Sequence, residues 1–129
     1  MKIFIILNVL ICVVVSEVSF EIVDDWNALA TPYSDVCISE SGANSETAKK
    51  MFENYKLVDE ERIRCYFKCI LMQHKFMQED GSFDVDRFVK GNEHVTREIA
   101  DTCLSKIANE KDLCKKGYLL ATCVIGENA

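Results

Sequence analysis

The sequence has few residues that break helices. It contains one proline, Pro32, and five glycines in 129 residues. Because both residue types mark turns and interrupt regular segments, their scarcity favours helices over strands. The chain shows no internal repeat, low-complexity segment or linker, and its length suits one domain. We therefore predict an all-α fold.

Basic residues are also fewer than acidic residues. The chain has 15 Lys and Arg residues against 21 Asp and Glu residues, a formal net charge of −6. A protein that binds nucleic acid or an anionic membrane surface needs a basic face. We therefore expect no nucleic-acid partner and a protein that stays soluble at high concentration.

A single apolar run stands at the N-terminus, in the segment MKIFIILNVLICVVVS. One lysine precedes a stretch from Ile3 to Val15, and the small residue Ser16 follows it. This is the layout of a secretory signal peptide. A transmembrane helix would need about 20 apolar residues, so the run is too short for one. We predict a signal peptide over 1–16, a mature domain over 17–129, secretion to the extracellular space and no membrane insertion.

Catalytic motifs are missing as well. No G-x-S-x-G is present. Cys12 leaves with the signal peptide, and the remaining six cysteines include no lone nucleophile. His74 and His94 are the only histidines, and we expect both to be solvated. An EF-hand loop beginning in the acidic segment 79–84 would have valine where its sixth position requires glycine. We predict no enzyme activity, no catalytic residue and no cofactor.

The apolar and polar residues divide the mature chain into six predicted helices. Pro32 lacks a backbone N–H and is expected to bend the first of them. We expect Ser45 and Asp59 to cap the second and third helices, and Gly91 to end the fourth. The predicted ranges are 23–39, 45–55, 59–77, 84–90, 92–109 and 111–124.

The stretch CYFKC (residues 65–69) places two cysteines one turn apart in a predicted helix. Structural zinc needs four Cys or His ligands, commonly as two close pairs, and the chain has no second close pair. A thioredoxin-like centre uses C-x-x-C at a helix start, whereas this motif is C-x-x-x-C inside a helix. An even number of cysteines in a short secreted chain is typical of disulfides. We therefore predict disulfides and no bound metal.

Six cysteines allow 15 pairings. A Cys65–Cys69 bridge would only join successive turns of one helix. Cys114 and Cys123 lie about 13 Å apart along another, beyond the reach of a disulfide. Excluding both leaves ten of the 15 pairings. In every one of the ten, CYFKC is joined to two other parts of the chain.

The cysteine spacing resembles that of insect odorant-binding proteins. From Cys37 to Cys123, successive cysteines are separated by 27, 3, 33, 10 and 8 residues. The gaps of three and eight are the most rigid ones in that family. The segment EDGSFD (Glu79–Asp84) is also similar to the family's usual sequence after the third helix. The resemblance covers essentially the whole mature chain.

The resemblance implies a compact, disulfide-stapled domain of six helices that encloses an apolar pocket. It implies the bridges Cys37–Cys69, Cys65–Cys114 and Cys103–Cys123. It further implies a carrier that takes small hydrophobic odorants or pheromones through aqueous lymph to olfactory receptors. The expected partners are a volatile or semi-volatile apolar ligand, with a receptor as a further candidate. We expect a monomer or a weak homodimer. The alternative is a non-olfactory carrier or interaction protein in venom, saliva, reproductive fluid or haemolymph.

Candidate ligand-binding residues lie on the apolar faces of the predicted helices. Similar proteins line the pocket two before and one after the last cysteine, here Ala121 and Val124. They also do so two residues to either side of the third pattern cysteine, here Phe67 and Leu71. Each candidate could equally be ordinary core, because any helical protein buries such a stripe. The full set is Met51, Phe52, Tyr55, Phe67, Leu71, Phe76, Phe88, Ala100, Tyr118, Ala121 and Val124.

Two features depart from the family's pattern. Gly117 stands where similar proteins frequently have alanine, and only VIGENA follows Cys123. These six residues span at most about 20 Å and are too short for a helix of their own. We therefore expect no C-terminal plug of the kind attributed to long-tailed relatives. Acid would instead loosen the protein gradually through His74, His94 and the carboxylates.

Overall fold

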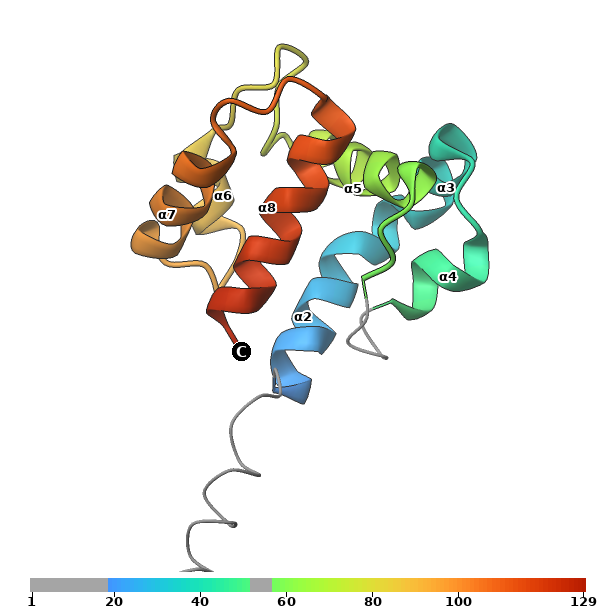
Figure 1. Cartoon of the computed structure of the whole chain (residues 1–129). Coiled ribbons are helices and arrows are strands. Elements are labelled where there is room, and N and C mark those ends of the chain that lie inside the picture. The colour runs from blue at the N-terminus through green and yellow to red at the C-terminus, as the bar shows by residue number, and fades with distance from the viewer. Residues whose placement is uncertain (1–18, 52–56) are drawn as a thin grey trace, which may run out of the picture.

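The computed structural model describes residues 19–51 and 57–129. The predicted signal peptide over 1–16, the candidates Phe52 and Tyr55, and the predicted end of the second helix lie outside these residues. Figure 1 shows the arrangement of the helices. They are α2 (Phe20–Ala30), the 3-10 turn η1 (Thr31–Tyr33), α3 (Ser34–Ser41), α4 (Ser45–Lys50), α5 (Glu61–Gln73), α6 (Val85–Lys90), α7 (Arg97–Ile107) and α8 (Leu113–Glu127).

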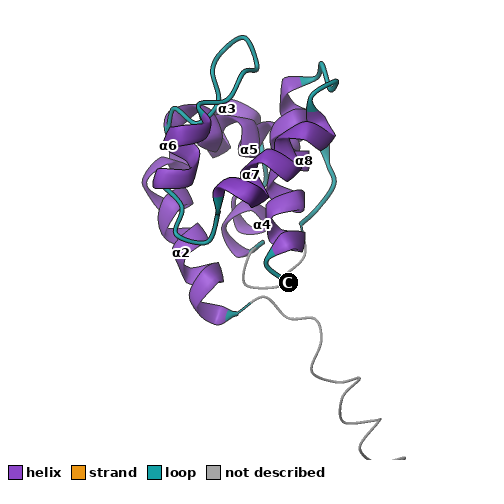
Figure 2. Ribbon diagram, turned by 90° about the vertical axis from the view of Figure 1, so that its left-hand side faces the viewer, coloured by secondary structure: helices purple, strands orange, loops and turns teal. Residues whose placement is uncertain are grey.

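The all-α prediction is confirmed for the described residues. Their one extended feature is an isolated bridge between Met77 and Phe83, on either side of a turn. Figure 2 shows helices throughout, with loops confined to the connections between them.

The helix predicted over 23–39 forms three elements, α2, η1 and α3. Pro32 lies in η1, between the two α-helices, where its ring and missing N–H interrupt a regular helix. α2 begins three residues earlier than predicted, because the side chain of Ser19 accepts a hydrogen bond from the N–H of Ile22.

Two predicted helix caps are wrong. Asn44, and not Ser45, caps α4 by accepting a hydrogen bond from a backbone N–H of its first turn. Glu60, and not Asp59, precedes α5, and it makes no side-chain capping bond. Asp59 instead forms an ion pair with Arg64.

The ends of α5, α7 and α8 also differ from the prediction. α5 ends four residues before Met77, because Lys75 has a left-handed backbone with φ of 64°, which a right-handed helix cannot include. α7 begins after Thr96, whose hydroxyl caps it, so that 92–95 form a loop. α8 begins after its cap Asp112 and extends three residues beyond Val124.

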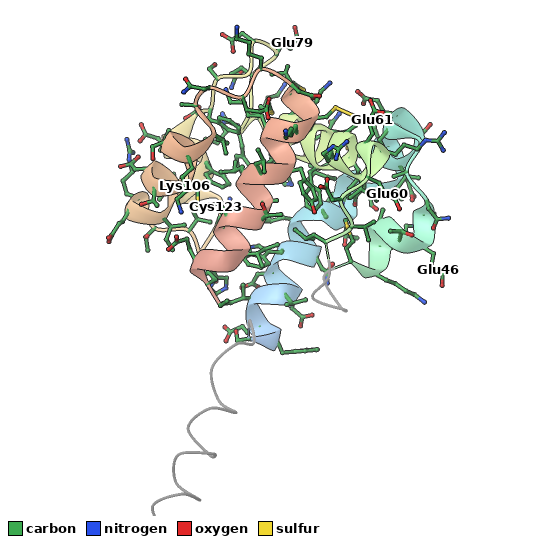
Figure 3. All side chains as sticks on the ribbon, in the orientation of Figure 1. Glu46, Glu60, Glu61, Glu79, Lys106 and Cys123 are labelled. Carbon is green, nitrogen blue, oxygen red and sulfur yellow. A yellow bond between two sulfur atoms is a disulfide. The ribbon has the colours of Figure 1, made fainter. Side chains whose placement is uncertain are left out.

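α8 lies at the centre of the helix packing. It packs along α5 on one side and α7 on the other, and α3 covers α5 (Figure 1). Charged side chains surround this body. Glu46, Glu61 and Glu79 are exposed and lie at its periphery (Figure 3), as expected for charged side chains, which are seldom fully buried.

Three disulfides join the helices that pack together. They are Cys37–Cys69 between α3 and α5, Cys65–Cys114 between α5 and α8, and Cys103–Cys123 between α7 and α8, with Cα–Cα distances of 5.5, 4.3 and 5.7 Å. These are the three pairs that the resemblance implies. The two cysteines of CYFKC therefore tie α5 to different helices.

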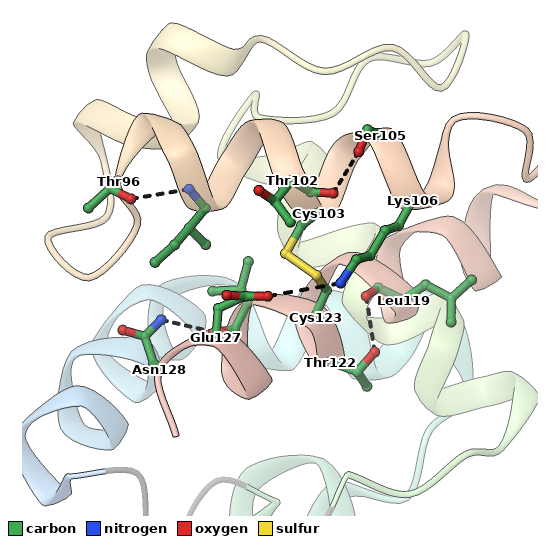
Figure 4. The surroundings of a disulfide bond; sticks show 12 residues. Thr96, Thr102, Cys103, Ser105, Lys106, Leu119, Thr122, Cys123, Glu127 and Asn128 are labelled. Carbon is green, nitrogen blue, oxygen red and sulfur yellow. Dashed lines mark hydrogen bonds and ion pairs between the residues drawn. A yellow bond between two sulfur atoms is a disulfide. The ribbon is translucent and has the colours of Figure 1, made fainter.

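The third disulfide has a second link between the same helices beside it. Figure 4 shows Cys103–Cys123 between α7 and α8, with Lys106 and Glu127 on the same two helices. Nζ of Lys106 lies 3.9 Å from Oε1 of Glu127. Because both side chains are well exposed, the ion pair adds little to stability, and the covalent bridge holds this end of α8.

The buried side chains form two clusters. The first lies between α2, α6, α7 and α8 and consists of Val23, Trp26, Phe76, Phe88, Val95, Ala100, Cys103, Ile107, Leu120 and Val124. The second lies around α3, α4 and α5 and consists of Cys37, Ala43, Ala48, Met51, Ile63, Tyr66, Phe67, Cys69, Ile70 and Tyr118. Since α8 contributes to both clusters, it connects the two halves of the core.

Candidate ligand-binding cavity

A cavity of about 90 Å³ lies between the two clusters. Its walls come from α2, α5, α6, α8, the segment after α5 and the loop between α6 and α7. Most of the lining side chains are aliphatic or aromatic. The full lining is Trp26, Leu29, Ala30, Tyr66, Phe67, Ile70, Leu71, His74, Phe76, Phe88, Asn92, Val95, Leu120, Ala121, Val124 and Ile125.

Helical periodicity explains how these elements reach one space. On α5 the lining residues are adjacent pairs one turn apart, Tyr66–Phe67 and Ile70–Leu71. On α8 they recur in the same way, as Leu120–Ala121 and Val124–Ile125. Residues spaced by three or four share one face of a helix, so each helix presents a continuous apolar stripe to the cavity.

Six of the predicted ligand-binding residues lie in the cavity wall. Four come from the two long helices: Phe67 and Leu71 lie on α5, and Ala121 and Val124 lie on α8. Phe76 and Phe88 close the cavity on the side of α6, with their rings edge to face at a centroid distance of 5.4 Å. Their contact with a ligand stays a prediction.

Three other candidates lie away from this cavity. Ala100, on α7, is completely buried in the first cluster. Met51 packs at the end of α4, in the second cluster. Tyr118 faces α5, where its ring meets that of Phe67 edge to face at 6.0 Å. Burial at helical spacing identified all three as interior, but the same pattern serves core and cavity alike.

The residue pattern missed ten residues of the wall. Trp26, Leu29 and Ala30 have the spacing i, i+3, i+4 of one helix face, so periodicity could have found them. His74 and Asn92 are polar, and no apolar pattern identifies such residues. The others are Tyr66, Ile70, Val95, Leu120 and Ile125.

His74 is part of the wall, and the expectation that it is solvated is wrong. Its ring is partly buried and stacks on Phe76 at a centroid distance of 5.1 Å. Tyr33 meets the same ring edge-on at 4.9 Å. Nε2 lies 2.6 Å from the carbonyl oxygen of Leu29 and donates to it, since a carbonyl oxygen can only accept. His74 thereby joins the end of α5 to α2.

Only a few other polar groups line the cavity, and they have partners. Asn92 is 8% exposed, and its Nδ2 donates to the carbonyl oxygen of Phe88 at 2.8 Å. The hydroxyl of Tyr66 lies 3.2 Å from Oγ of Ser34. Burial raises the pKa of Tyr66 above its ordinary 10.0, although the bond to Ser34 lowers it somewhat. Within the described residues, the lining therefore contains no carboxylate, ammonium or guanidinium group, and it suits an apolar ligand.

One group of side chains in the described ranges could hold a metal ion. Ligand atoms of Asp25, Glu93 and His94 lie within 4.8 Å of one another. Structural zinc generally takes four protein ligands, and Glu93 is exposed. His94 Nε2 and Asp25 Oδ2 already satisfy each other at 2.6 Å. We therefore interpret this group as a polar link from α2 to the loop that carries Asn92.

That link also corrects the expectation that His94 is solvated. Its side chain is 22% exposed and that of Asp25 is 43% exposed.

Within residues 19–51 and 57–129, no helix is long and apolar enough to cross a membrane.

The fold and the cavity define a small, disulfide-bridged helical domain with an apolar cavity among its helices. The model of the PBP/GOBP family matches residues 21–127, and the chain belongs to this family of insect odorant- and pheromone-binding proteins. Its members bind and carry small hydrophobic ligands and are not enzymes. No curated protein and no solved structure matches the chain.

Proposed function

We propose that the protein is a secreted carrier that binds small hydrophobic odorants or pheromones in the cavity between α2, α5 and α8. It takes these ligands through aqueous lymph to olfactory receptors. The observation that supports this function best is the lining of the cavity, in which aromatic and aliphatic side chains surround the space. Transfer of an apolar ligand from water into such a space is favourable in proportion to the apolar area that is buried.

The volume of the cavity bears on the size of the ligand that it can hold. The space is about 90 Å³, against roughly 300–1,000 Å³ for pockets that hold drug-sized ligands. A short volatile compound fits with little rearrangement. A long-chain ligand requires movement of wall side chains, among which Leu71 and Ile125 are only partly buried.

Transport also requires export and solubility. We propose that residues 1–16 direct secretion and that residues 17–129 form the mature carrier. Family membership supports this assignment, since proteins of this family are secreted. The full sequence has a net charge of −6, and loss of Lys2 with residues 1–16 leaves the carrier still more acidic, which keeps it dispersed at high concentration.

Native mass spectrometry of protein taken from the animal tests this function. A bound neutral apolar compound in protein from antennae supports olfactory transport. The same finding in glands or haemolymph, with no protein in antennae, would favour a non-olfactory carrier. A fluorescent apolar probe gives the complementary test. We expect micromolar binding and displacement by uncharged alcohols, esters or aldehydes, and failure of all three classes to displace the probe would overturn the proposal.

A further inference from the structure

A basic cleft adjoins the apolar cavity. Its volume is about 450 Å³, and it is more open to solvent than the cavity. It is lined by Leu29, His74, Phe76, Arg87, Lys90 and Gly91. Leu29, His74 and Phe76 also line the cavity. The two spaces are therefore adjacent and share these three side chains.

Helix α6 contributes side chains to the walls of both the cavity and the cleft. Phe88 lines the cavity and is 4% exposed. Arg87 and Lys90, on the same helix, line the cleft instead and are exposed. The Nε of Arg87 lies 3.8 Å from Oδ2 of Asp84, a long and exposed pair that leaves the guanidinium able to bind another anion. Within the described part of the chain, Lys90 has no ion pair.

The charge of this cleft contrasts with the rest of the molecule. The chain carries a net charge of −6, yet no carboxylate lines the cleft, and both permanent charges in its lining are positive. Since guanidinium and ammonium groups donate charge-assisted hydrogen bonds to carboxylates, the cleft is complementary to a small anionic group.

Phe76, which lines both spaces, packs closely against Gly91. At Gly91 a Cβ would approach Cζ of Phe76 to 2.9 Å and the carbonyl oxygen of Arg87 to 3.1 Å. The absence of a side chain at Gly91 lets the ring of Phe76 lie against the backbone at the cleft. Because Phe76 lines both the cleft and the cavity, a change in its side-chain rotamer would alter both spaces.

We propose that the cleft binds the head group of an amphipathic carboxylate whose aliphatic chain occupies the cavity. Arg87 and Lys90 bind the carboxylate, and Phe76 moves aside to let the chain pass. The ligand class is a medium-chain fatty carboxylate. The inference rests on the proposed function, because it uses the same cavity for the apolar chain.

The test compares three probes with the same ten-carbon chain and different head groups. Decanoate, 1-decanol and decylamine compete with a fluorescent apolar probe on the wild type and on Arg87→Ala/Lys90→Ala. Lys49→Ala/Lys50→Ala is the matched control. It removes the same charge from α4, where both lysines are exposed and pair with Asp35 and Glu46.

We expect decanoate to bind the wild type more tightly than decylamine. Arg87→Ala/Lys90→Ala should weaken decanoate by roughly tenfold, as expected for two lost charge-assisted contacts near the surface, and leave decanol within about twofold. The loss should shrink at high salt because exposed charges are screened. The control variant should bind all three probes as the wild type does.

Two results would overturn the proposal. In the first, Arg87→Ala/Lys90→Ala weakens decanoate no more than decanol. In the second, the control variant weakens decanoate equally, which would reduce the effect to net charge. Failure of decanol and decanoate alike to displace the probe from the wild type would instead contradict the proposed function. Circular dichroism on each variant checks that the helical content is unchanged.

Discussion

The imidazole of His94 and the carboxylate of Asp25 are hydrogen-bonded, with Nε2 and Oδ2 2.6 Å apart. They are 69 residues apart in the sequence and join the first described helix to the loop between α6 and α7. Their neighbours in the chain, Trp26 on one side and Asn92 and Val95 on the other, line the cavity. The bond therefore holds two walls of the cavity in a fixed relation.

Replacing His94 with alanine should loosen these walls. We expect a loss of about 1 kcal/mol in the free energy of unfolding, typical of one partly exposed hydrogen bond, and faster release of a bound apolar probe. Denaturant unfolding and stopped-flow dissociation measure the two effects. Asp25→Asn is the matched control, since its amide oxygen can still accept from the ring, and it should cost less than His94→Ala. Equal effects of the two variants would contradict this role.

The size of the cavity can be tested from within α8. Ala121 lines the cavity, and Ala121→Trp should fill it and weaken an apolar probe by at least about tenfold, because bulk replaces the ligand. Gly126→Trp on the same helix is the control, since Gly126 is exposed and a Cβ added there meets nothing within 4 Å, and it should bind as the wild type does. Unchanged affinity in Ala121→Trp would place the site elsewhere.

Because the phenol of Tyr66 is buried, the stability of the folded protein should depend on pH in the alkaline range. Burial raises its pKa in the folded protein above 10.0, so folding favours the neutral phenol. Stability from this source is complete below pH 10. It is lost as the pH rises through the folded pKa, because the unfolded chain loses its proton first. Burial raises the pKa of Tyr118 as well, so that residue adds to the same alkaline loss.

Tyr66→Phe should therefore make stability less sensitive to pH above 10, although Tyr118 keeps part of the effect. At neutral pH the variant should lose about 1 kcal/mol, since the hydroxyl of buried Ser34 loses its partner. Urea unfolding at pH 7 and at several values above pH 10 measures both effects. An alkaline loss as steep as in the wild type would show that other groups control it.

Local sequence patterns predicted the helices better than the cavity. Periodic apolar residues and the interruption at Pro32 depend on nearby residues only, so they are visible in the chain. The end of α5 was missed because the left-handed backbone at Lys75 has no signature in the sequence. Ala100 and Val124 both belong to the first cluster of buried residues, yet only Val124 lines the cavity. That difference depends on how helices distant in sequence pack.

Polar members of the site could not be predicted for a related reason. His74 and Asn92 line the cavity, and each donates a hydrogen bond to a backbone carbonyl oxygen, that of Leu29 or of Phe88. The bond of His74 spans 45 residues, and pattern reasoning works over much shorter stretches. The permanent charges of the cleft, on Arg87 and Lys90, likewise read as an ordinary solvated helix face until their position beside Phe76 is known.

Gly117 allows α8 to lie close to α5. A Cβ at this position would approach the Cα and N of Lys68 to 3.1 Å and Cδ1 of Leu71 to 3.3 Å. The Cys65–Cys114 disulfide joins the same two helices one turn away, so the backbone of α5 cannot easily withdraw. Gly117→Ala gains up to about 1 kcal/mol in helix propensity. It loses about 1–3 kcal/mol through overpacking, so we expect a net loss of about 1 kcal/mol.

Gly126→Ala on the same helix separates propensity from packing. Space is open there, and the position lies one residue before the last of α8, so we expect a gain of about 0.5 kcal/mol, less than for a central position. Urea unfolding of both variants measures the difference. Because Leu71 also lines the cavity, Gly117→Ala should change the affinity for an apolar probe, whereas Gly126→Ala should not. If Gly117→Ala stabilises the protein as much as Gly126→Ala does, the close approach of α8 to α5 is not a constraint on this fold.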